Sequence, residues 1–103
     1  MYSITYTSTL KKGKSLNDFQ KWLKSSWEFQ QTWGAESVYF WSERNGKDRL
    51  LFCQYMVKDI RRWNQSAIRC ESAIPVMELA RITETNRITI RRVFSFGRMN
   101  PNN

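Results

Sequence analysis

Residues 35–57 read AESVYFWSERNGKDRLLFCQYMV, and this stretch decides the fold of the chain. Runs of β-branched, aromatic and aliphatic residues predict one strand over residues 35–44 and another over residues 48–57. The NGKD segment between them, at residues 45–48, is typical of a β-hairpin turn. The stretch therefore predicts two neighbouring antiparallel strands.

The second strand of this hairpin is apolar on both of its faces. One face carries Leu50, Phe52 and Met56, and the other carries Leu51, Cys53, Tyr55 and Val57. A strand with two apolar faces is normally covered on both of them, whereas the helices of one small domain cover one side. The simplest cover for the other side is a second copy of the chain, so the sequence predicts a homodimer.

Toward the N-terminus the sequence predicts a strand and then a helix. Residues 2–10, YSITYTSTL, alternate with the period of a strand. Ser15 opens the segment SLND, which resembles a capping box, so a helix is expected over residues 16–32 with Gly34 following its end. The apolar arc of this helix is too wide for one stripe, and part of it needs a second cover or lines a cavity. That part consists of Trp22, Phe29 and Trp33.

Toward the C-terminus a second helix is expected, with Asp59 as its N-cap. Its apolar face recurs at Ile60, Trp63, Ala67, Cys70 and Ile74. Pro75 interrupts this helix, and residues 76–83 predict a further short helix. Residues 87–96, RITIRRVFSF, predict the last strand.

The predicted order of elements is the ferredoxin-like βαββαβ arrangement. This is an α+β fold, in which a four-stranded antiparallel sheet carries two main helices on one face. A chain of 103 residues is expected to form a single domain, here residues 1–96, followed by a flexible tail at residues 97–103.

The composition excludes several classes of chemistry. The chain has no histidine, which excludes Ser-His-Asp and Cys-His catalysis, His-ligated haem and most zinc sites. Its cysteines, Cys53 and Cys70, have no metal-like spacing and are expected to be free thiols. No apolar run is long enough to span a membrane and the first residues do not resemble a signal peptide, so a cytoplasmic protein without a membrane partner is expected.

The order of elements, the two-faced strand and the helix entry VKDIRRW at residues 57–63 resemble the dimeric α/β-barrel superfamily. This superfamily includes antibiotic-biosynthesis-type monooxygenases and NIPSNAP-like proteins. The segment LKKGKSLNDF at residues 10–19 resembles its strand-glycine-helix entry, and residues 34–63 are similar to the NIPSNAP-like run of glycine, aromatic hairpin and helix. The likeness covers residues 2–96.

This resemblance implies that two sheets pack face to face in a homodimer and that each subunit keeps a pocket between its sheet and its helices. It also implies a cofactor-independent monooxygenase or isomerase acting on an aromatic or polyketide-like molecule, because some members use neither metal nor flavin. The members that bind haem through a histidine are a poor match, since this chain has no histidine.

Six side chains are candidates for such a pocket. The expected catalytic residues are Tyr55, Asn64 and Arg92, and the expected substrate-binding residues are Tyr6, Trp41 and Trp63. Tyr55 would transfer a proton, Asn64 would hydrogen-bond the substrate, and Arg92 would stabilise an oxyanion. Trp63 would stack on the substrate, although its helical spacing equally suits a core residue.

Arg92 shares its expected strand face with apolar residues, and a charge in such a place needs a partner or a ligand. Three explanations are open from the sequence. Arg92 contacts an anionic ligand, it pairs with Glu36 or Glu43, or a bulge at Arg91–Arg92 turns it outward. Arg61 and Arg62 similarly suit either solvated surface or an anion contact at the mouth of the pocket.

The net charge of +8 favours anionic partners. RNA binding is the competing class, because the RNA recognition motif has the same order of elements and reads bases on its open sheet face. However, Phe52 and Tyr55 are three residues apart and so face opposite sides, and the characteristic RNA-binding motif is missing. The sequence favours a homodimer that binds an aromatic or anionic small molecule, and it leaves RNA binding and plain protein association open.

Overall fold

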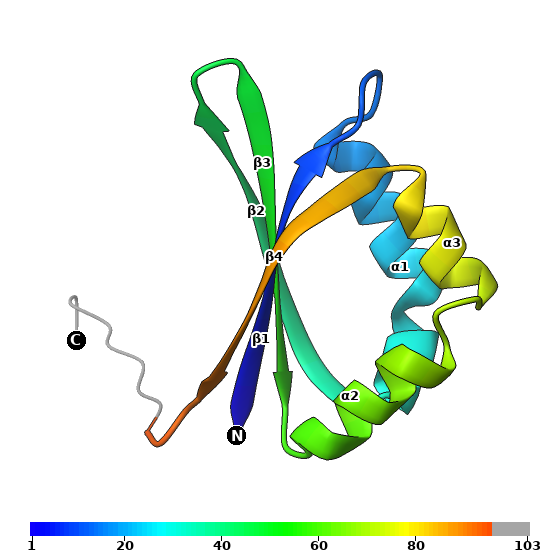
Figure 1. The fold of residues 1–103 in the computed structure, drawn as a ribbon, viewed down its shortest axis with the longest axis vertical. Helices are drawn as coiled ribbons and strands as arrows, with labels where there is room; N and C mark the ends of the chain where they lie inside the picture. Colours follow the sequence, from blue (N-terminus) through cyan, green and yellow to red (C-terminus); the bar gives the residue numbers. More distant parts are fainter. Residues whose placement is uncertain (96–103) are drawn as a thin grey trace, which may run out of the picture.

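The computed structural model describes residues 1–95, apart from the side chain of Asn45. Seven elements follow one another along the chain (Figure 1): β1 (Tyr2–Leu10), α1 (Leu16–Thr32), β2 (Ala35–Asn45), β3 (Asp48–Val57), α2 (Ile60–Arg69), α3 (Ile74–Ala80) and β4 (Thr83–Arg92). The predicted tail at residues 97–103 lies outside the described residues. Among the described residues no helix is both long and apolar enough to cross a membrane.

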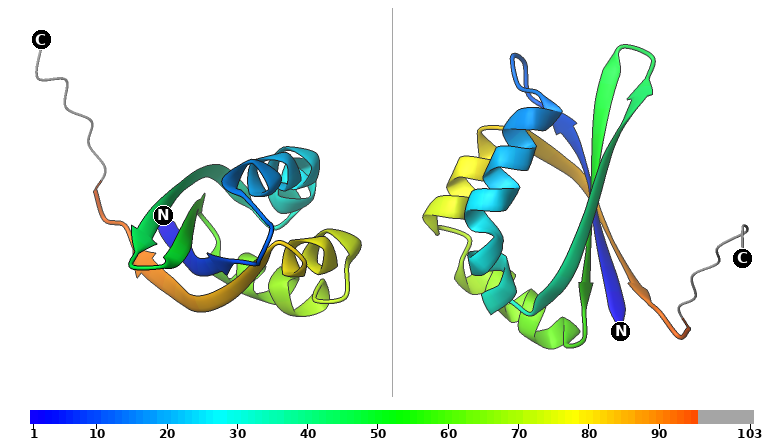
Figure 2. Two further views of the ribbon diagram at one scale, coloured as in Figure 1. Left: turned by 90° about the horizontal axis from the view of Figure 1, so that it is seen from above. Right: turned by 180° about the vertical axis from the view of Figure 1, so that it is seen from behind.

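The four strands form one antiparallel sheet in the order β2-β3-β1-β4. All three helices lie against the same face of this sheet, as both views in Figure 2 show. The predicted α+β, ferredoxin-like βαββαβ fold is therefore confirmed. The face that the helices cover is called the inner face below, and the opposite one the outer face.

Helix α1 begins and ends where the sequence predicts. Its first turn is closed by a capping box, in which the Asp18 amide donates to Ser15 Oγ (3.3 Å) and the Ser15 amide donates to Asp18 Oδ2 (2.7 Å). The Ser15 hydroxyl also donates to Asp18 Oδ2 at 3.0 Å, and the hydrogen bonds from the Ser15 amide and hydroxyl lower the pKa of the Asp18 carboxyl. Because the box fixes the start of α1, it also fixes which of its side chains face the sheet.

The prediction for the second helix is wrong in its length, because it continues the helix as far as Ile74. Helix α2 ends at Arg69 and Cys70 is its C-cap, while Ile74 is 71% exposed and begins the separate helix α3. A turn follows Cys70, whose carbonyl accepts the Ala73 amide at 2.9 Å. Pro75 sits in the first turn of α3, where a helix tolerates proline because no amide is needed there.

The last predicted strand is shifted. It is expected over residues 87–96, but β4 spans Thr83–Arg92 and so begins four residues earlier. Its bounds follow its neighbour β1, because Leu10 lies opposite Thr83 and Tyr2 lies opposite Arg92. The register between these strands shifts at Thr7 and Ser8. At the other end Arg91 pairs with Ser3 and Arg92 with Tyr2 in regular register, without a bulge.

The prediction that β3 has two apolar faces is confirmed. Leu51, Cys53, Tyr55 and Val57 are buried on the inner face. On the outer face, Leu50, Phe52 and Met56 are half-buried. Neighbouring Tyr39 and Trp41 on β2 share this outer face, and both are exposed. No helix among the described residues covers the outer face, so the single chain leaves an apolar sheet surface open.

Candidate functional site

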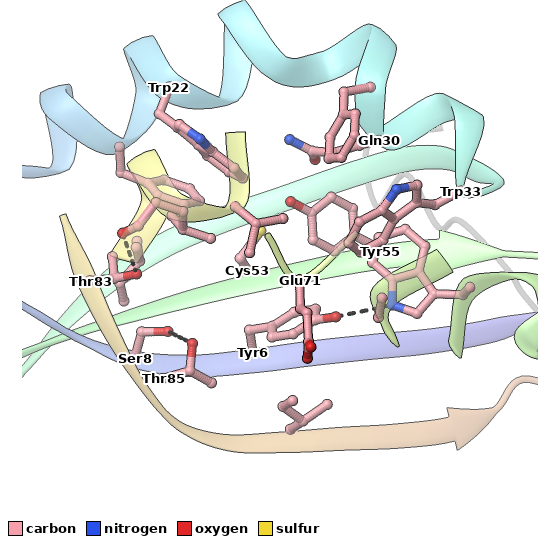
Figure 3. Close-up of a pocket in the computed structure, with 18 residues that line it drawn as sticks. Tyr6, Ser8, Trp22, Gln30, Trp33, Cys53, Tyr55, Glu71, Thr83 and Thr85 are labelled. Atoms are coloured by element: carbon pink, nitrogen blue, oxygen red, sulfur yellow. Dashed lines mark hydrogen bonds between the residues drawn. The ribbon is translucent and has the colours of Figure 1, made fainter. Parts of the chain in front are cut away.

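The candidate site is a cavity of about 270 Å³ between the inner sheet face and the helices. All three helices and strands β1, β3 and β4 contribute to its lining (Figure 3). Its aromatic members include Tyr6, Trp22, Phe29, Trp33, Tyr55 and Trp63. The sequence predicts that Trp22, Phe29 and Trp33, on the wide apolar arc of α1 and its end, need a second cover or line a cavity. All three line this cavity.

Trp63 organises one end of this cavity. Its indole Nε1 donates a hydrogen bond to the Tyr6 hydroxyl at 3.0 Å. Its ring centre lies 5.1 Å from that of Trp33 and 4.8 Å from that of Tyr55. Such close ring pairs stabilise a structure beyond the area that they bury. Trp63 is 2% exposed, so it is at once a core residue and part of the cavity wall.

The polar groups on the sheet side of the cavity are held in their neutral forms. Burial raises the pKa of the Tyr6 hydroxyl, and it raises that of Tyr55 well above its ordinary value. Burial likewise raises the pKa of the Cys53 thiol to about 12. These groups therefore stay protonated at neutral pH, so both tyrosines offer hydrogen-bond donors rather than bases.

These raised pKa values predict a loss of stability in alkaline solution. Above pH 9 to 10 the unfolded chain releases the Cys53, Tyr6 and Tyr55 protons while the folded chain keeps them. The unfolded state then binds fewer protons, so stability falls with rising pH, by at most about 1.4 kcal/mol per pH unit and group. Urea unfolding between pH 7 and 11 measures this slope. The Cys53→Ala variant should show a shallower slope, and a flat profile would contradict the assignment.

Glu71 is the one charged residue among those that line the cavity in the described part of the chain. It is exposed and lies in the turn between α2 and α3. A carboxylate at this position disfavours anionic ligands inside the cavity and leaves neutral ones unaffected. The interior of the site is thus aromatic and uncharged, although the protein as a whole carries a net charge of +8.

The structure brings three of the six predicted site residues together. Tyr6, Tyr55 and Trp63 line the same cavity and contact one another. Asn64 is exposed on α2, one residue beyond Trp63 and therefore turned away from the sheet. Trp41 lies on the outer face, where its ring stacks on Phe52 at 5.2 Å. Neither Asn64 nor Trp41 lines the cavity.

Arg92 also lies outside the cavity. It is exposed at the end of β4, and its guanidinium carbon sits 5.0 Å from the centre of the Phe94 ring. The expected ion pairs are not found, because Glu36 pairs with Lys58 (3.2 Å) and Glu43 accepts from the Trp41 indole (3.3 Å). Arg92 does share its strand face with Ile88 and Ile90, as predicted. No described helix covers the end of β4 where Arg92 lies, so its guanidinium stays in water.

The sequence interpretation missed Gln30, which is buried at the cavity. A signal for it exists, because Leu23, Ser26, Gln30 and Trp33 follow one another at helical spacing within the apolar arc of α1. Ser26 and Gln30 are polar residues in that arc, and both are buried. Polar groups buried on a helix face need partners, and so they mark a position worth inspecting.

No protein-family model and no curated protein matches this sequence. Solved structures do match its fold. The crystal structure of HapK from Hahella chejuensis has a TM-score of 0.73 at 11% identity, covering 97% of this chain and 99% of that one. A dimeric ferredoxin-like protein from an uncultured marine organism has a TM-score of 0.62 at 13% identity, covering 96% and 100%.

A third match is SnoaB, a cofactor-independent oxygenase from Streptomyces nogalater, with a TM-score of 0.62 at 10% identity and coverage of 97% of this chain and 96% of that one. At such identities the likeness establishes the fold and no activity. Together with the strand order, it shows that this chain has a ferredoxin-like fold.

Proposed function

We propose that this protein is a homodimer that binds a neutral aromatic or polyketide-like molecule in the cavity and oxidises or isomerises it without a cofactor. The observation that carries the proposal is the cavity itself, a space walled by aromatic rings that faces the hydroxyls of half-buried Tyr6 and buried Tyr55. Ligand sites commonly combine such apolar walls with a few directed polar groups. The likeness to a cofactor-independent oxygenase supports the choice of chemistry.

The cavity offers donors for a substrate that develops negative charge on oxygen. An enolate or phenolate forms when a proton leaves an aromatic ketone or phenol, and hydrogen-bond donors in a water-poor site stabilise it. Tyr55 is buried, protonated and directed into the cavity (Figure 3), so we assign it this donor role. Arg92 is too far out on β4 to supply a charge there, which favours neutral donors for this task.

The proposed dimer forms through the outer face of the sheet. That face exposes Tyr39 and Trp41 beside Phe52 and is left open by the helices. Apolar surfaces of this kind commonly mark interfaces, and solved structures with the same fold are described as dimeric ferredoxin-like proteins. A dimer through this face leaves the cavity of each subunit untouched, because the cavity lies on the other side of the sheet.

Filling the cavity tests the proposed binding site. Ala67 on α2 lines the cavity, and Ala67→Phe adds a ring to that space. We expect this variant to bind anthrone, an aromatic ketone that readily forms an enolate, at least about tenfold more weakly than the unaltered protein, since overlap with the ligand costs more than 1.4 kcal/mol. Equilibrium dialysis measures the affinity, and oxygen consumption with the same compound reports turnover.

The matched control is Ala80→Phe, which adds the same ring to an exposed position at the end of α3. Ala80 does not line the cavity, so this variant should bind the ketone normally. Circular dichroism shows whether both variants fold, since overpacking alone costs about 1–3 kcal/mol. Equal binding by the two variants would overturn the cavity as the ligand site.

RNA binding remains the second candidate, and one observation favours it. Arg87 and Arg91 on β4 share the outer face with the stacked pair of Trp41 and Phe52. Aromatic and cationic side chains on an open sheet are what single-stranded nucleic acid requires. This candidate needs a monomer with an open outer face, so the oligomeric state separates the two proposals.

A further inference from the structure

The end of the cavity near Trp63 contains two polar atoms that have no hydrogen-bond partner among the described residues. They are the side-chain oxygen of Gln30, Oε1, and the indole nitrogen of Trp33, Nε1. Both atoms are buried, and both residues line the cavity. Figure 3 shows the two side chains beside Tyr55, at the end of the cavity formed by the second half of α1. One atom is an acceptor and the other is a donor.

The orientation of the Gln30 amide is fixed by its neighbours. Gln30 Nε2 donates to Ser26 Oγ at 2.7 Å, and the Ser26 hydroxyl donates its only hydrogen to the Trp22 carbonyl at 2.7 Å. Turning the amide over would place two acceptors against each other, because Ser26 has no second hydrogen to give. The amide must therefore keep its oxygen as the free end.

Leaving such atoms unpaired is unfavourable for the folded chain. Buried polar groups are hydrogen-bonded in the great majority of cases, and an apolar side chain at either position would avoid the penalty. Neighbouring polar groups are paired, since Trp63 Nε1 donates to the Tyr6 hydroxyl and Gln30 Nε2 donates to Ser26 Oγ, so neither is a partner for the two free atoms. A group that enters the cavity and offers both a donor and an acceptor would remove the penalty at both atoms.

We infer that Gln30 and Trp33 form the recognition end of the cavity, and that its ligand is a neutral aromatic ring carrying a carbonyl oxygen and an adjacent N–H or O–H. Cyclic amides and hydroxy-ketones are molecules of this class. The carbonyl accepts from the Trp33 indole, and the N–H or O–H donates to Gln30 Oε1. This inference rests on the proposed function, because it names the class of molecule that the same cavity takes.

Neither atom is accessible to water, so the ligand must move the surrounding rings to reach them. The aromatic walls then contribute contact area that does not depend on the ligand's polar edge. The two contributions are separable with ligands of one shape. The compound 2-quinolone has an adjacent N–H and C=O, quinoline keeps only an acceptor, and naphthalene has neither.

Equilibrium dialysis of the three compounds tests the inference. The unaltered protein should bind 2-quinolone about tenfold or more tightly than naphthalene, with quinoline between them, since each neutral hydrogen bond changes affinity by about three- to tenfold. Gln30→Met keeps a side chain of similar length and removes the unpaired oxygen, and Trp33→Phe keeps an aromatic ring and removes the indole N–H. Each should reduce the preference for 2-quinolone about three- to tenfold while the affinity for naphthalene stays within about twofold.

Two matched controls lie on the same helix. Gln31→Met alters an exposed glutamine next to Gln30, and Trp27→Phe alters a half-buried tryptophan that does not line the cavity. Both should keep the full preference for 2-quinolone. Urea unfolding shows whether the variants fold. Gln30→Met also removes the hydrogen bond from Gln30 Nε2 to Ser26 Oγ, and Trp33→Phe leaves a smaller ring in a buried place, so some loss of stability is expected in both and the ligand preference carries the test.

The outcomes separate the inference from the proposal beneath it. Equal binding of 2-quinolone and naphthalene by the unaltered protein, or an unchanged preference in both variants, would overturn the recognition role and leave the cavity as a binding site. Failure of all three compounds to bind would overturn the binding site, and the recognition role with it. Lower stability without a change in preference would show that the two residues serve packing alone.

Discussion

Trp63→Ala is expected to lower the free energy of unfolding by about 3–5 kcal/mol, the usual range for removing a buried aromatic side chain. The small domain has only about 5–15 kcal/mol in total, so much of the protein should be unfolded near 37 °C. The effect is large because Trp63 contacts Trp33 and Tyr55 and donates a hydrogen bond to the Tyr6 hydroxyl. Urea unfolding followed by circular dichroism measures the loss.

Trp63→Phe is the matched variant for this experiment. It keeps an aromatic ring but removes the indole N–H, so the largely buried Tyr6 hydroxyl loses its donor. We expect a smaller loss, about 1–3 kcal/mol, as is common when a buried polar group is left without its partner. A loss below about 1 kcal/mol for Trp63→Ala would mean that the aromatic cluster does not hold the helices to the sheet.

Phe52→Glu is expected to convert the proposed dimer into a monomer. Phe52 stacks on Trp41 in the middle of the outer face, and the twofold symmetry of a homodimer introduces the new carboxylate twice. A charge left unpaired in a buried interface costs about 3–5 kcal/mol, so the dissociation constant should rise by at least about a hundredfold. Light scattering at two salt concentrations should show a salt-resistant dimer before the substitution and half that mass after it.

Ile68→Glu is the control, because Ile68 is exposed on α2 and lies away from the outer face. This variant should remain a dimer. If Phe52→Glu also remained a dimer, the interface would lie elsewhere on the chain. If the unaltered protein were a monomer, the outer face would be open in solution, and titration with single-stranded RNA would become the next experiment.

The candidate site was only partly predictable. Tyr6, Tyr55 and Trp63 were identified because alternation along a strand and spacing along a helix reveal which side chains point toward a common layer. Arg92 was placed on the correct strand face, but whether a helix covers that end of the strand depends on where β4 pairs with β1. Gln30 was missed because its unpaired oxygen becomes apparent only when the partners of every neighbouring atom are known.

The errors in the fold have a similar cause. The sequence pattern around Ile74 continues the apolar face of α2, yet the chain turns after Cys70 so that α3 lies beside α1. Trp22 then donates to the Pro75 carbonyl at 2.9 Å, a contact between residues 53 positions apart. Helical periodicity reports on one helix at a time. It therefore does not predict a turn whose position depends on a contact with a residue far away in the sequence.

Local patterns by themselves determined the ferredoxin-like order of elements, the bounds of α1 and the two apolar faces of β3. Each follows from interactions within a few residues, such as the Ser15–Asp18 capping box and the hairpin glycine Gly46 with its positive φ. Only the tertiary structure decided which rings enclose the cavity, which charge stays outside it, and which buried atoms lack partners. These depend on long-range packing, where side chains from six different elements meet in one small volume.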